Sequence, residues 1–157
     1  MKKLKKKFPS YFKRFELPEG ATEQRIEVFR ACKTHKIDKG SFMPTFEENN
    51  YSYLDGEDPS DPGVYSLSTY ENPRDVRRFA NTNNNFRPPY KIAEGFTEPN
   101  CGPSQRTKER KKGRRPKYKS SHIDWWIYEN EEPHQHFELI EDFNEYYSNY
   151  KRERESE

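Results

Sequence analysis

The residues with the clearest chemical character form a dense basic run between positions 106 and 119. Its cations, with only Glu109 opposing them, are Arg106, Lys108, Arg110, Lys111, Lys112, Arg114, Arg115, Lys117 and Lys119. Arginine and lysine at this density neutralise phosphates with release of counterions, and Tyr118 could stack on an unpaired base. The run therefore favours binding to a polyanion, either nucleic acid or an acidic protein surface. The alternative is a solvated loop that pairs with the acidic C-terminal helix of its own chain, where exposed ion pairs contribute little.

A second motif is a strand-like segment, Val64-Tyr65-Ser66-Leu67-Ser68-Thr69-Tyr70, which precedes a helix ending in Arg78-Phe79-Ala80. It resembles the central motif of ADP-ribosyltransferases, in which a strand bearing Ser-Thr-Ser or a near variant precedes a helix that often ends in Phe-Ala. The resemblance implies NAD as the cofactor. It gives Ser68 and Thr69 the role of shaping the NAD pocket, and Tyr65 or Tyr70 that of stacking on the nicotinamide. The alternative is that Ser68 and Thr69 simply end a strand before a capped helix.

The same family has an arginine or histidine on an early strand, for which this chain offers Arg30 or His35. Both fall near a predicted helix. The family also has a glutamate, often in Glu-x-Glu, near a later strand, and Glu129-Asn130-Glu131 has that form. The resemblance thus implies Ser68, Thr69 and Glu131 as the catalytic set.

A metal site is the weakest of the chemical interpretations. Cys32-x-x-His35 and His134-x-His136, with Cys101 or His122, offer enough ligands for zinc, but neither pair has the spacing of an established zinc finger. Surface or capping histidines account for the pattern, so we expect no metal.

The segment that must position these groups is Ser120-Ser121-His122-Ile123-Asp124-Trp125-Trp126-Ile127-Tyr128, which holds both tryptophans of the chain. As a strand it places Ile123, Trp125 and Ile127 on one face and its other side chains on the opposite face. Large aromatic surface on both faces predicts a central strand that is covered from both sides. His122 and Asp124 share a face two residues apart, so they form a dyad only if a bulge turns one of the two side chains. The alternative is that this face lines a pocket. The candidate pocket residues are Tyr65, Tyr70, His122, Asp124 and Trp126.

Composition predicts one domain with a small core built mainly of rings. The chain has 157 residues, of which 29% are hydrophobic, 36% charged and 15% aromatic. Net charge is only +2, but basic and acidic segments are segregated. Two cysteines without a disulfide framework indicate a reducing, cytoplasmic setting. No apolar run approaches the length of a membrane span, and the basic start at Met1–Phe8 lacks the apolar segment of a secretory signal.

Periodicity predicts an α+β domain over residues 21–150 with a small mixed or antiparallel sheet. Helices are expected near 23–34, capped by Thr22, and near 73–81, capped by Asn72 with Pro73 at the first position and Asp75 at N3 in the manner of a capping box. A third helix is expected near 137–150, begun by a short extended piece at Phe137–Leu139. Strands are expected at 64–70, 90–95 and 120–128, with a further short one at the end of 41–54. Residues 98–119 lack apolar periodicity and predict a long mobile loop. Residues 1–20 form a basic aromatic segment with a short helix between Pro9 and Pro18, and the charged tail 151–157 should fray.

These patterns support three hypotheses from different functional classes. The first is a cytoplasmic, non-catalytic interaction module that binds a polyanionic partner through the basic loop and needs no cofactor. The second is an enzyme, an ADP-ribosyltransferase-like domain using NAD. The third is self-association, in which the basic loop of one copy meets the acidic helix of another.

Overall fold

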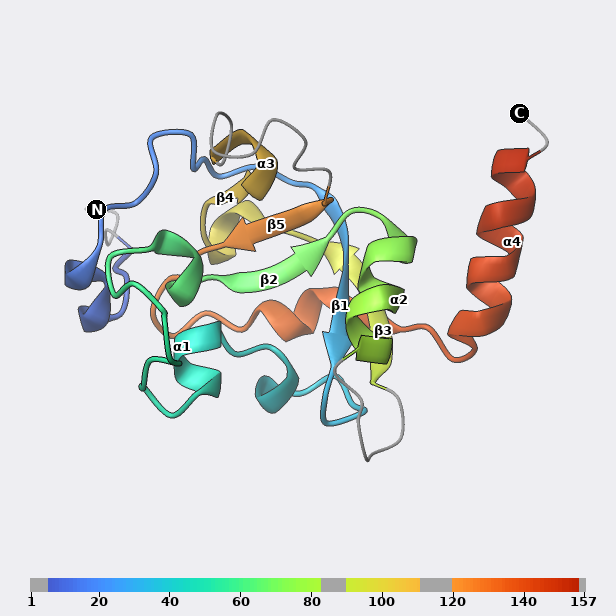
Figure 1. The fold of residues 1–157 in the computed structure, drawn as a ribbon, viewed down its shortest axis with the longest axis horizontal. Coiled ribbons are helices and arrows are strands. Elements are labelled where there is room, and N and C mark those ends of the chain that lie inside the picture. The colour runs from blue at the N-terminus through green and yellow to red at the C-terminus, as the bar shows by residue number, and fades with distance from the viewer. Residues whose placement is uncertain (1–5, 83–89, 111–119, 156–157) are drawn as a thin grey trace, which may run out of the picture.

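Six antiparallel strands form one sheet in the order β4-β5-β2-β1-β3-β6 (Figure 1). The computed structural model describes residues 6–82, 90–110 and 120–155. Its strands are β1 (Glu27–Cys32), β2 (Leu67–Tyr70), β3 (Lys91–Phe96), β4 (Ser104–Arg106), β5 (His122–Trp125) and β6 (Phe137–Leu139). Its α-helices are α1 (Thr45–Glu48), α2 (Pro73–Thr82), α3 (Thr107–Arg110) and α4 (Phe143–Glu155). The expected α+β class with an antiparallel sheet is confirmed.

The tryptophan strand has the expected faces. Trp125 packs with Ile123 and Ile127 in one core cluster, whereas Trp126 packs in another with Phe46 and Tyr65. Both indole side chains are 0% exposed. β5 lies inside the sheet between β4 and β2, one position away from its middle.

The prediction of a helix at 23–34 is wrong, because this segment contains the strand β1. Its apolar residues fit either a helix or a strand that is covered on both faces, and five of the six β1 positions are buried. β1 pairs with both β2 and β3. This pairing with neighbouring strands makes the segment a strand, although its apolar spacing also fits a helix. Thr22 caps no helix and instead forms an isolated bridge with Ser104.

The mobile loop expected at 98–119 is wrong for residues 98–110, which form a 3-10 turn at Pro99–Cys101, then β4 and α3. Apolar periodicity could not reveal β4, since its buried residues Ser104 and Gln105 are polar. Gly102 permits this path: its φ is +148°, and a Cβ there would lie 1.8 Å from the Trp126 carbonyl oxygen. Residues 111–119 of the expected loop lie outside the described residues.

Several other helices and strands begin or end at residues different from those expected. The segment 64–70 is a 3-10 turn (Pro62–Tyr65) followed by β2, and no strand forms at 51–54. The extended piece at Phe137–Leu139 is confirmed as β6, and the helix after it extends to Glu155, so that residues 151–155 are helical. A short 3-10 helix (Ser10–Arg14) lies between Pro9 and Pro18, as expected.

Helix α2 is confirmed, with a different role for one of its capping residues. The Asn72 side-chain oxygen accepts the Arg74 N–H at 2.8 Å and caps the helix. The expected capping box does not form. Instead the Asp75 carboxylate accepts the Ser121 N–H at 2.9 Å and the Ser121 hydroxyl at 2.7 Å, which ties α2 to the entry of β5.

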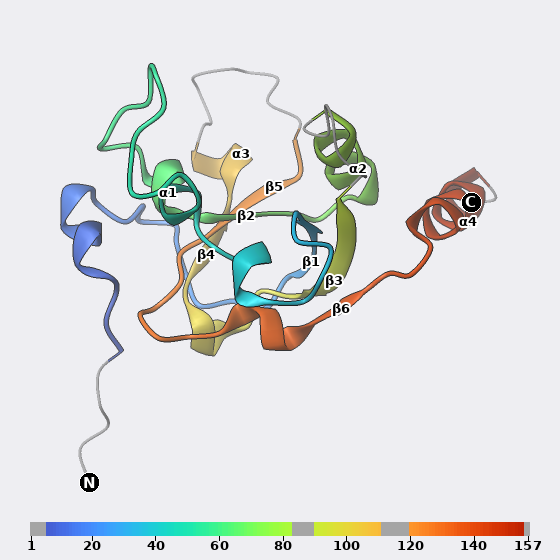
Figure 2. The ribbon, with the colours of Figure 1, turned by 90° about the horizontal axis from the view of Figure 1, so that it is seen from below.

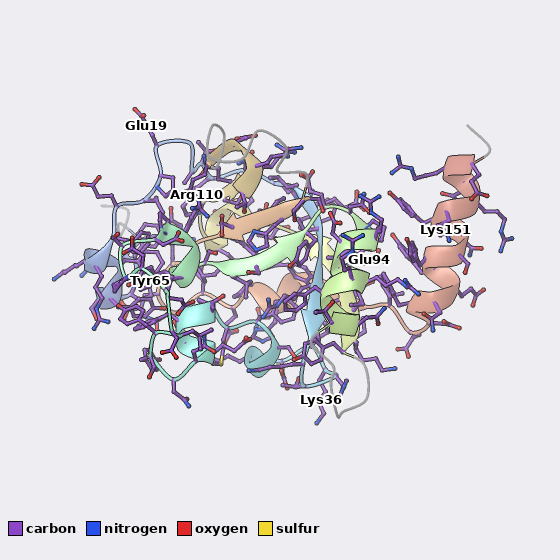
Figure 3. The ribbon with its side chains drawn as sticks, viewed as in Figure 1. Glu19, Lys36, Tyr65, Glu94, Arg110 and Lys151 are labelled. Atoms are coloured by element: carbon purple, nitrogen blue, oxygen red, sulfur yellow. The ribbon has the colours of Figure 1, made fainter. Side chains whose placement is uncertain are left out.

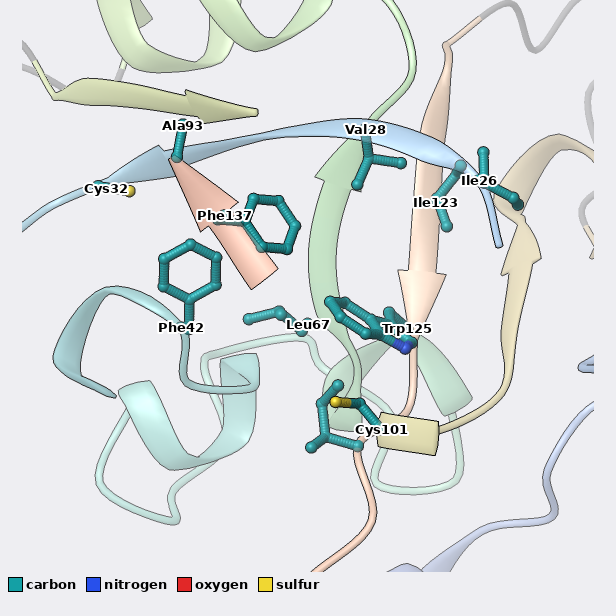
Figure 4. Packing of buried hydrophobic residues seen from close by; sticks show 11 residues of the cluster. Ile26, Val28, Cys32, Phe42, Leu67, Ala93, Cys101, Ile123, Trp125 and Phe137 are labelled. Carbon is teal, nitrogen blue, oxygen red and sulfur yellow. The ribbon is translucent and has the colours of Figure 1, made fainter. Parts of the chain in front are cut away.

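Three packed clusters make up the core, with rings prominent in each. One lies around Trp125, Leu67 and Phe137 (Figure 4). The second holds the N-terminal segment in place by rings, including Phe15 stacked on Tyr65 with centroids 4.5 Å apart. The third joins Phe29 and Ala31 of β1 to α2.

Helix α4 projects beyond the rest of the fold. Figure 2 shows α2 and α3 over one side of the sheet and α4 extending away at one end. The start of α4 packs on the core through Phe143 and Tyr146, and Tyr147 contacts Arg77 of α2. No helix within residues 6–82, 90–110 and 120–155 is long and apolar enough to cross a membrane.

Both cysteines are buried free thiols. Burial raises the pKa of Cys32 and of Cys101 to about 11, so that both thiols stay protonated near neutral pH.

Candidate functional site

The neighbouring strands β1, β2 and β5 bring three chemically active residue types together around Ser68. Ser68 lies on β2, directly opposite Asp124 of β5. From β1, the Arg30 guanidinium donates through Nη1 to the Ser68 carbonyl oxygen at 2.9 Å. The Ser68 backbone is therefore held by an arginine of β1, while the Ser68 side chain shares a face with the Asp124 carboxylate of β5.

On the face of the sheet that α2 and α3 cover, polar side chains form a continuous row that we call the polar strip. It consists of Ser66, Ser68 and Tyr70 of β2 and its immediate entry, together with His122 and Asp124 of β5. The pairing register places Tyr70 opposite His122, and their rings lie 5.3 Å apart. Opposed residues share a face, so the register aligns these side chains.

Asp124 is the centre of the polar strip and is 0% exposed. Its carboxylate accepts hydrogen bonds from the Ser66 hydroxyl (2.6 Å), the Thr107 hydroxyl (2.7 Å) and Arg110 Nη2 (2.8 Å). Burial by itself raises the pKa of this carboxyl. The charges of His122 and Arg110, with the hydrogen bonds from Arg110 and Ser66, outweigh burial and hold its pKa below the ordinary value. Asp124 is therefore an ionised, fully engaged group that suits fixing positions and stabilising positive charge.

Thr107 connects His122 to this carboxylate. Its hydroxyl donates its single proton to Asp124 and lies 2.6 Å from His122 Nδ1, so that Nδ1 carries a proton toward Thr107. His122 and Asp124 thus share a face, as the alternation predicts, and are joined through Thr107. His122 Nδ1 lies 3.9 Å from Asp124 Oδ1. The side chains of His122 and Arg110 are 17% and 16% exposed, so the polar strip reaches the surface at this end.

Arg30 acts from the opposite face of the sheet. Phe29 and Ala31 pack toward α2, and strand alternation turns the side chain between them the other way. Arg30 also donates to the Ser41 carbonyl oxygen at 2.9 Å and pairs with Glu48 at 3.4 Å. Burial lowers the pKa of its guanidinium, and Glu48 opposes that shift. With three separate partners, Arg30 fixes the position of the β2 backbone.

The other residues expected to line a pocket lie in different places. Tyr65 is fully buried among the rings of the N-terminal segment (Figure 3), and its hydroxyl bonds the Pro59 carbonyl. Trp126 is fully buried in the same cluster and donates to the Pro62 carbonyl at 3.0 Å. Thr69 is fully buried, and alternation places it on the face opposite Ser68.

Glu131 lies on the turn after β5. Its carboxylate pairs with Lys6 at 3.0 Å, and it lines a hollow whose walls do not include Ser68. A second hollow that Glu131 lines, beside Cys101 and Gln135, does not include Ser68 either.

Two cations of the basic run are bound within the fold. Arg106 holds Glu71 through two bonds of 2.7 and 3.2 Å, and Arg110 pairs with both Asp124 and Asp61. Lys108 is exposed on α3. The remaining members lie outside the described residues: Lys111, Lys112, Arg114, Arg115, Lys117, Tyr118 and Lys119.

Sequence reasoning missed Ser66 and Thr107 as members of this network. Ser66 carried a signal, because it lies two residues before Ser68 and so faces the same way. No sequence signal marked Thr107, because the segment around it has no apolar periodicity. Among residues 6–82, 90–110 and 120–155, no three histidines, cysteines or carboxylates gather as metal ligands.

No protein-family model, curated protein or solved structure matches this chain. The case for its function therefore depends on the residues and their geometry.

Proposed function

We propose that this chain is an NAD-using, ADP-ribosyltransferase-like domain whose site runs along β2. The observation that carries the proposal is the order of Arg30, Ser68 and Asp124 on three adjacent strands, with Arg30 bonded to the Ser68 backbone and Asp124 paired opposite Ser68. The resemblance of the β2 motif to this family implies an early-strand arginine, a serine-bearing strand and a glutamate near a later strand, and the first two of these occur on neighbouring strands here. The chain departs from the family pattern in carrying an aspartate on the later strand, while the Glu-x-Glu sequence follows on the turn.

Each group has a role that its surroundings allow. Arg30 is a positioning residue, since it donates to the backbone carbonyls of Ser68 on β2 and of Ser41 and pairs with the Glu48 side chain of α1. Ser68 is half-buried and offers a hydroxyl on the polar strip. Transfer of ADP-ribose breaks the bond between nicotinamide and ribose and leaves positive charge on the sugar. An ionised, preorganised carboxylate stabilises developing positive charge of this kind. Asp124 is fully buried and held by three donors, so its role is that of a positioning residue that orders the polar strip. Glu131 is the candidate acid.

Replacement of Ser68 by alanine is expected to lower NAD turnover by about tenfold or more, in line with the loss of one preorganised polar group. The measurement is nicotinamide release and transfer of labelled ADP-ribose to proteins of a cell lysate. Ser52→Ala is the matched control, because Ser52 is exposed and loses the same hydroxyl. Glu131→Gln tests whether Glu131 is the acid that is needed. Asp124→Asn also lowers stability, so its activity is compared only under conditions in which circular dichroism shows it folded. The proposal fails if wild-type protein neither transfers label nor releases nicotinamide, or if Ser68→Ala matches Ser52→Ala.

A second candidate is polyanion binding through the basic run, and the anchoring of α3 favours it. The Arg110–Asp124 and Arg106–Glu71 contacts fix this helix to the sheet, with Lys108 exposed at the start of the run. Since Arg106 and Arg110 are already paired, the remaining cations would carry the binding.

Simultaneous replacement of Lys111, Lys112, Arg114 and Arg115 by glutamine should weaken binding to a single-stranded RNA probe. The plot of log affinity against log salt should lose a slope of roughly 0.7 for each phosphate contact removed. Fluorescence anisotropy at a series of salt concentrations measures both quantities. An unchanged affinity and slope would exclude the run as the binding element.

A further inference from the structure

A cavity of about 460 Å³ lies between helix α4 and the end of the sheet at which β1 begins. We call this cavity the α4 slot. Its size is in the range of small-molecule sites in proteins. The helix lines it with two tyrosine rings, and the sheet side lines it with apolar and charged groups. The residues that matter for a ligand are Tyr146, Tyr150, Phe29, Pro73, Arg25 and Glu27.

The rings of the α4 slot are held in fixed positions. Tyr146 packs edge-on against Phe29, with ring centroids 5.8 Å apart and planes at 70°. The Tyr150 hydroxyl accepts a hydrogen bond from Arg154 Nη1 at 2.7 Å, and the Arg154 guanidinium lies 5.6 Å from the centre of the Tyr150 ring. Burial, followed by the nearby Glu94 carboxylate, raises the pKa of Tyr146, so that its ring stays neutral. Neutral, positioned rings of this kind suit stacking on a flat ligand.

On the sheet side of the α4 slot, Arg25 presents a pair of N–H donors. Its guanidinium lies 4.0 Å from the centre of the Phe96 ring, and its Nε donates to the Glu98 carboxylate at 3.3 Å. Within the described residues, its two Nη groups make no hydrogen bond. The side chain is 59% exposed. Stacking and one ion pair therefore fix the plane of the guanidinium and leave its outer edge facing a ligand.

Glu27 presents acceptors on the same wall. It lies two residues after Arg25, and residues at this spacing in an extended chain face the same way. No ion pair or hydrogen bond from the described part of the chain engages its carboxylate. The other charged pair of the lining, Arg106 and Glu71, satisfies itself through two bonds of 2.7 and 3.2 Å. The α4 slot thus offers an arginine fork and a carboxylate next to each other.

A ligand that uses all of these groups must be flat and must carry paired donors beside paired acceptors. Guanine meets both conditions. Its N1–H and 2-amino groups match a carboxylate, and its O6 and N7 atoms match an arginine fork. Adenine has neither an N1–H nor a 2-amino group, so it cannot donate twice to one carboxylate.

We propose that the α4 slot binds a guanine base. The base stacks on Tyr150, donates to Glu27 and accepts from Arg25. A free guanine nucleotide and an unpaired guanosine of single-stranded RNA both present this base. The site is independent of NAD use, because its lining includes neither Ser68 nor Asp124.

The test compares guanosine monophosphate (GMP) with inosine monophosphate (IMP), which lacks only the 2-amino group, by isothermal titration calorimetry. We expect GMP to bind about tenfold more tightly, because IMP loses one hydrogen bond to a charged group. Glu27→Gln should weaken GMP binding by a similar factor and reduce the preference over IMP. Tyr150→Ala should weaken the binding of both nucleotides about fivefold or more through the loss of stacking.

Two matched controls lie outside the lining. Glu138→Gln changes an exposed glutamate of another strand, β6. Tyr147→Ala removes a half-buried ring of the same helix that contacts Arg77 instead of the α4 slot. Both variants should leave GMP affinity unchanged, and circular dichroism shows whether each variant is folded.

A second arm uses the RNA strands UUGUU and UUIUU, in which inosine replaces the single guanosine. A preference for GMP over IMP identifies the free nucleotide as sufficient, and a preference seen only between the two strands identifies guanosine within RNA. The proposal is overturned if neither arm prefers guanine, or if Glu27→Gln has no more effect than Glu138→Gln.

Discussion

Replacing Asp124 with asparagine is expected to lower the free energy of unfolding by about 3 kcal/mol. The substitution leaves the Arg110 guanidinium largely buried without its closest carboxylate, and an uncompensated buried charge is costly. Urea unfolding monitored by tryptophan fluorescence measures the change, because both indoles are buried in the native fold. Asp61→Asn is the control. Asp61 also pairs with Arg110 but is 42% exposed, so its loss should cost less than about 1 kcal/mol.

The same substitution should change how stability depends on pH. The pKa of Asp124 is lowered in the folded state, so the unfolded chain takes up a proton first as pH falls. The stability that Asp124 contributes is fully present above its unfolded pKa of about 3.9 and is lost as pH falls through the lower folded value. The Asp124→Asn variant should therefore lose less stability than the wild type as the pH falls below about 5. Equal costs for Asp124→Asn and Asp61→Asn, with parallel acid profiles, would contradict the central role given to this carboxylate.

Trp125→Ala is expected to lower the free energy of unfolding by about 3–5 kcal/mol. The side chain is fully buried in the main core cluster, and its indole N–H donates to the Gly102 carbonyl oxygen at 3.0 Å. Domains of this size have total stabilities of about 5–15 kcal/mol, so the loss is a large part of the whole. Urea unfolding followed by circular dichroism is the measurement.

Two further variants separate the causes. Trp125→Phe keeps an aromatic ring and removes the hydrogen bond, so it should cost less than the alanine variant. Leu54→Ala removes an apolar side chain that is 57% exposed and should change stability by less than about 0.5 kcal/mol. A Trp125→Ala variant as stable as Leu54→Ala would show that the tryptophan strand is not a core element.

The elements predicted correctly are those in which the local pattern and the tertiary environment agree. Alternation of Ile123, Trp125 and Ile127 with His122, Asp124 and Trp126 gave the faces of β5. Asn72-Pro73 marked the start of α2. β1 was missed because a strand that is covered on both faces lacks alternation and can match the period of a helix. β4 was missed because its buried residues are polar and gain their place by pairing with β5.

The residues of the candidate site also fall into those that the sequence predicted and those that depend on the tertiary structure. His122 and Asp124 came from strand alternation, which is a local property, and Ser68 and Tyr70 came from the resemblance of the β2 motif. The contribution of Thr107 and Arg110 depends on a chain path that no local pattern reports. Arg30 was noticed as a residue type, but its approach to Ser68 depends on β1 being a strand that lies beside β2.

The most direct test of the proposed site is a titration of isotope-labelled protein with NAD, monitored by the backbone amide signals. The account predicts saturable shifts at Ser68, Tyr70 and His122, with residues 145–155 of α4 unchanged, and loss of those shifts in the Ser68→Ala variant. No shift along β2 and β5 at millimolar NAD, or shifts of the same size in Ser68→Ala, would contradict it.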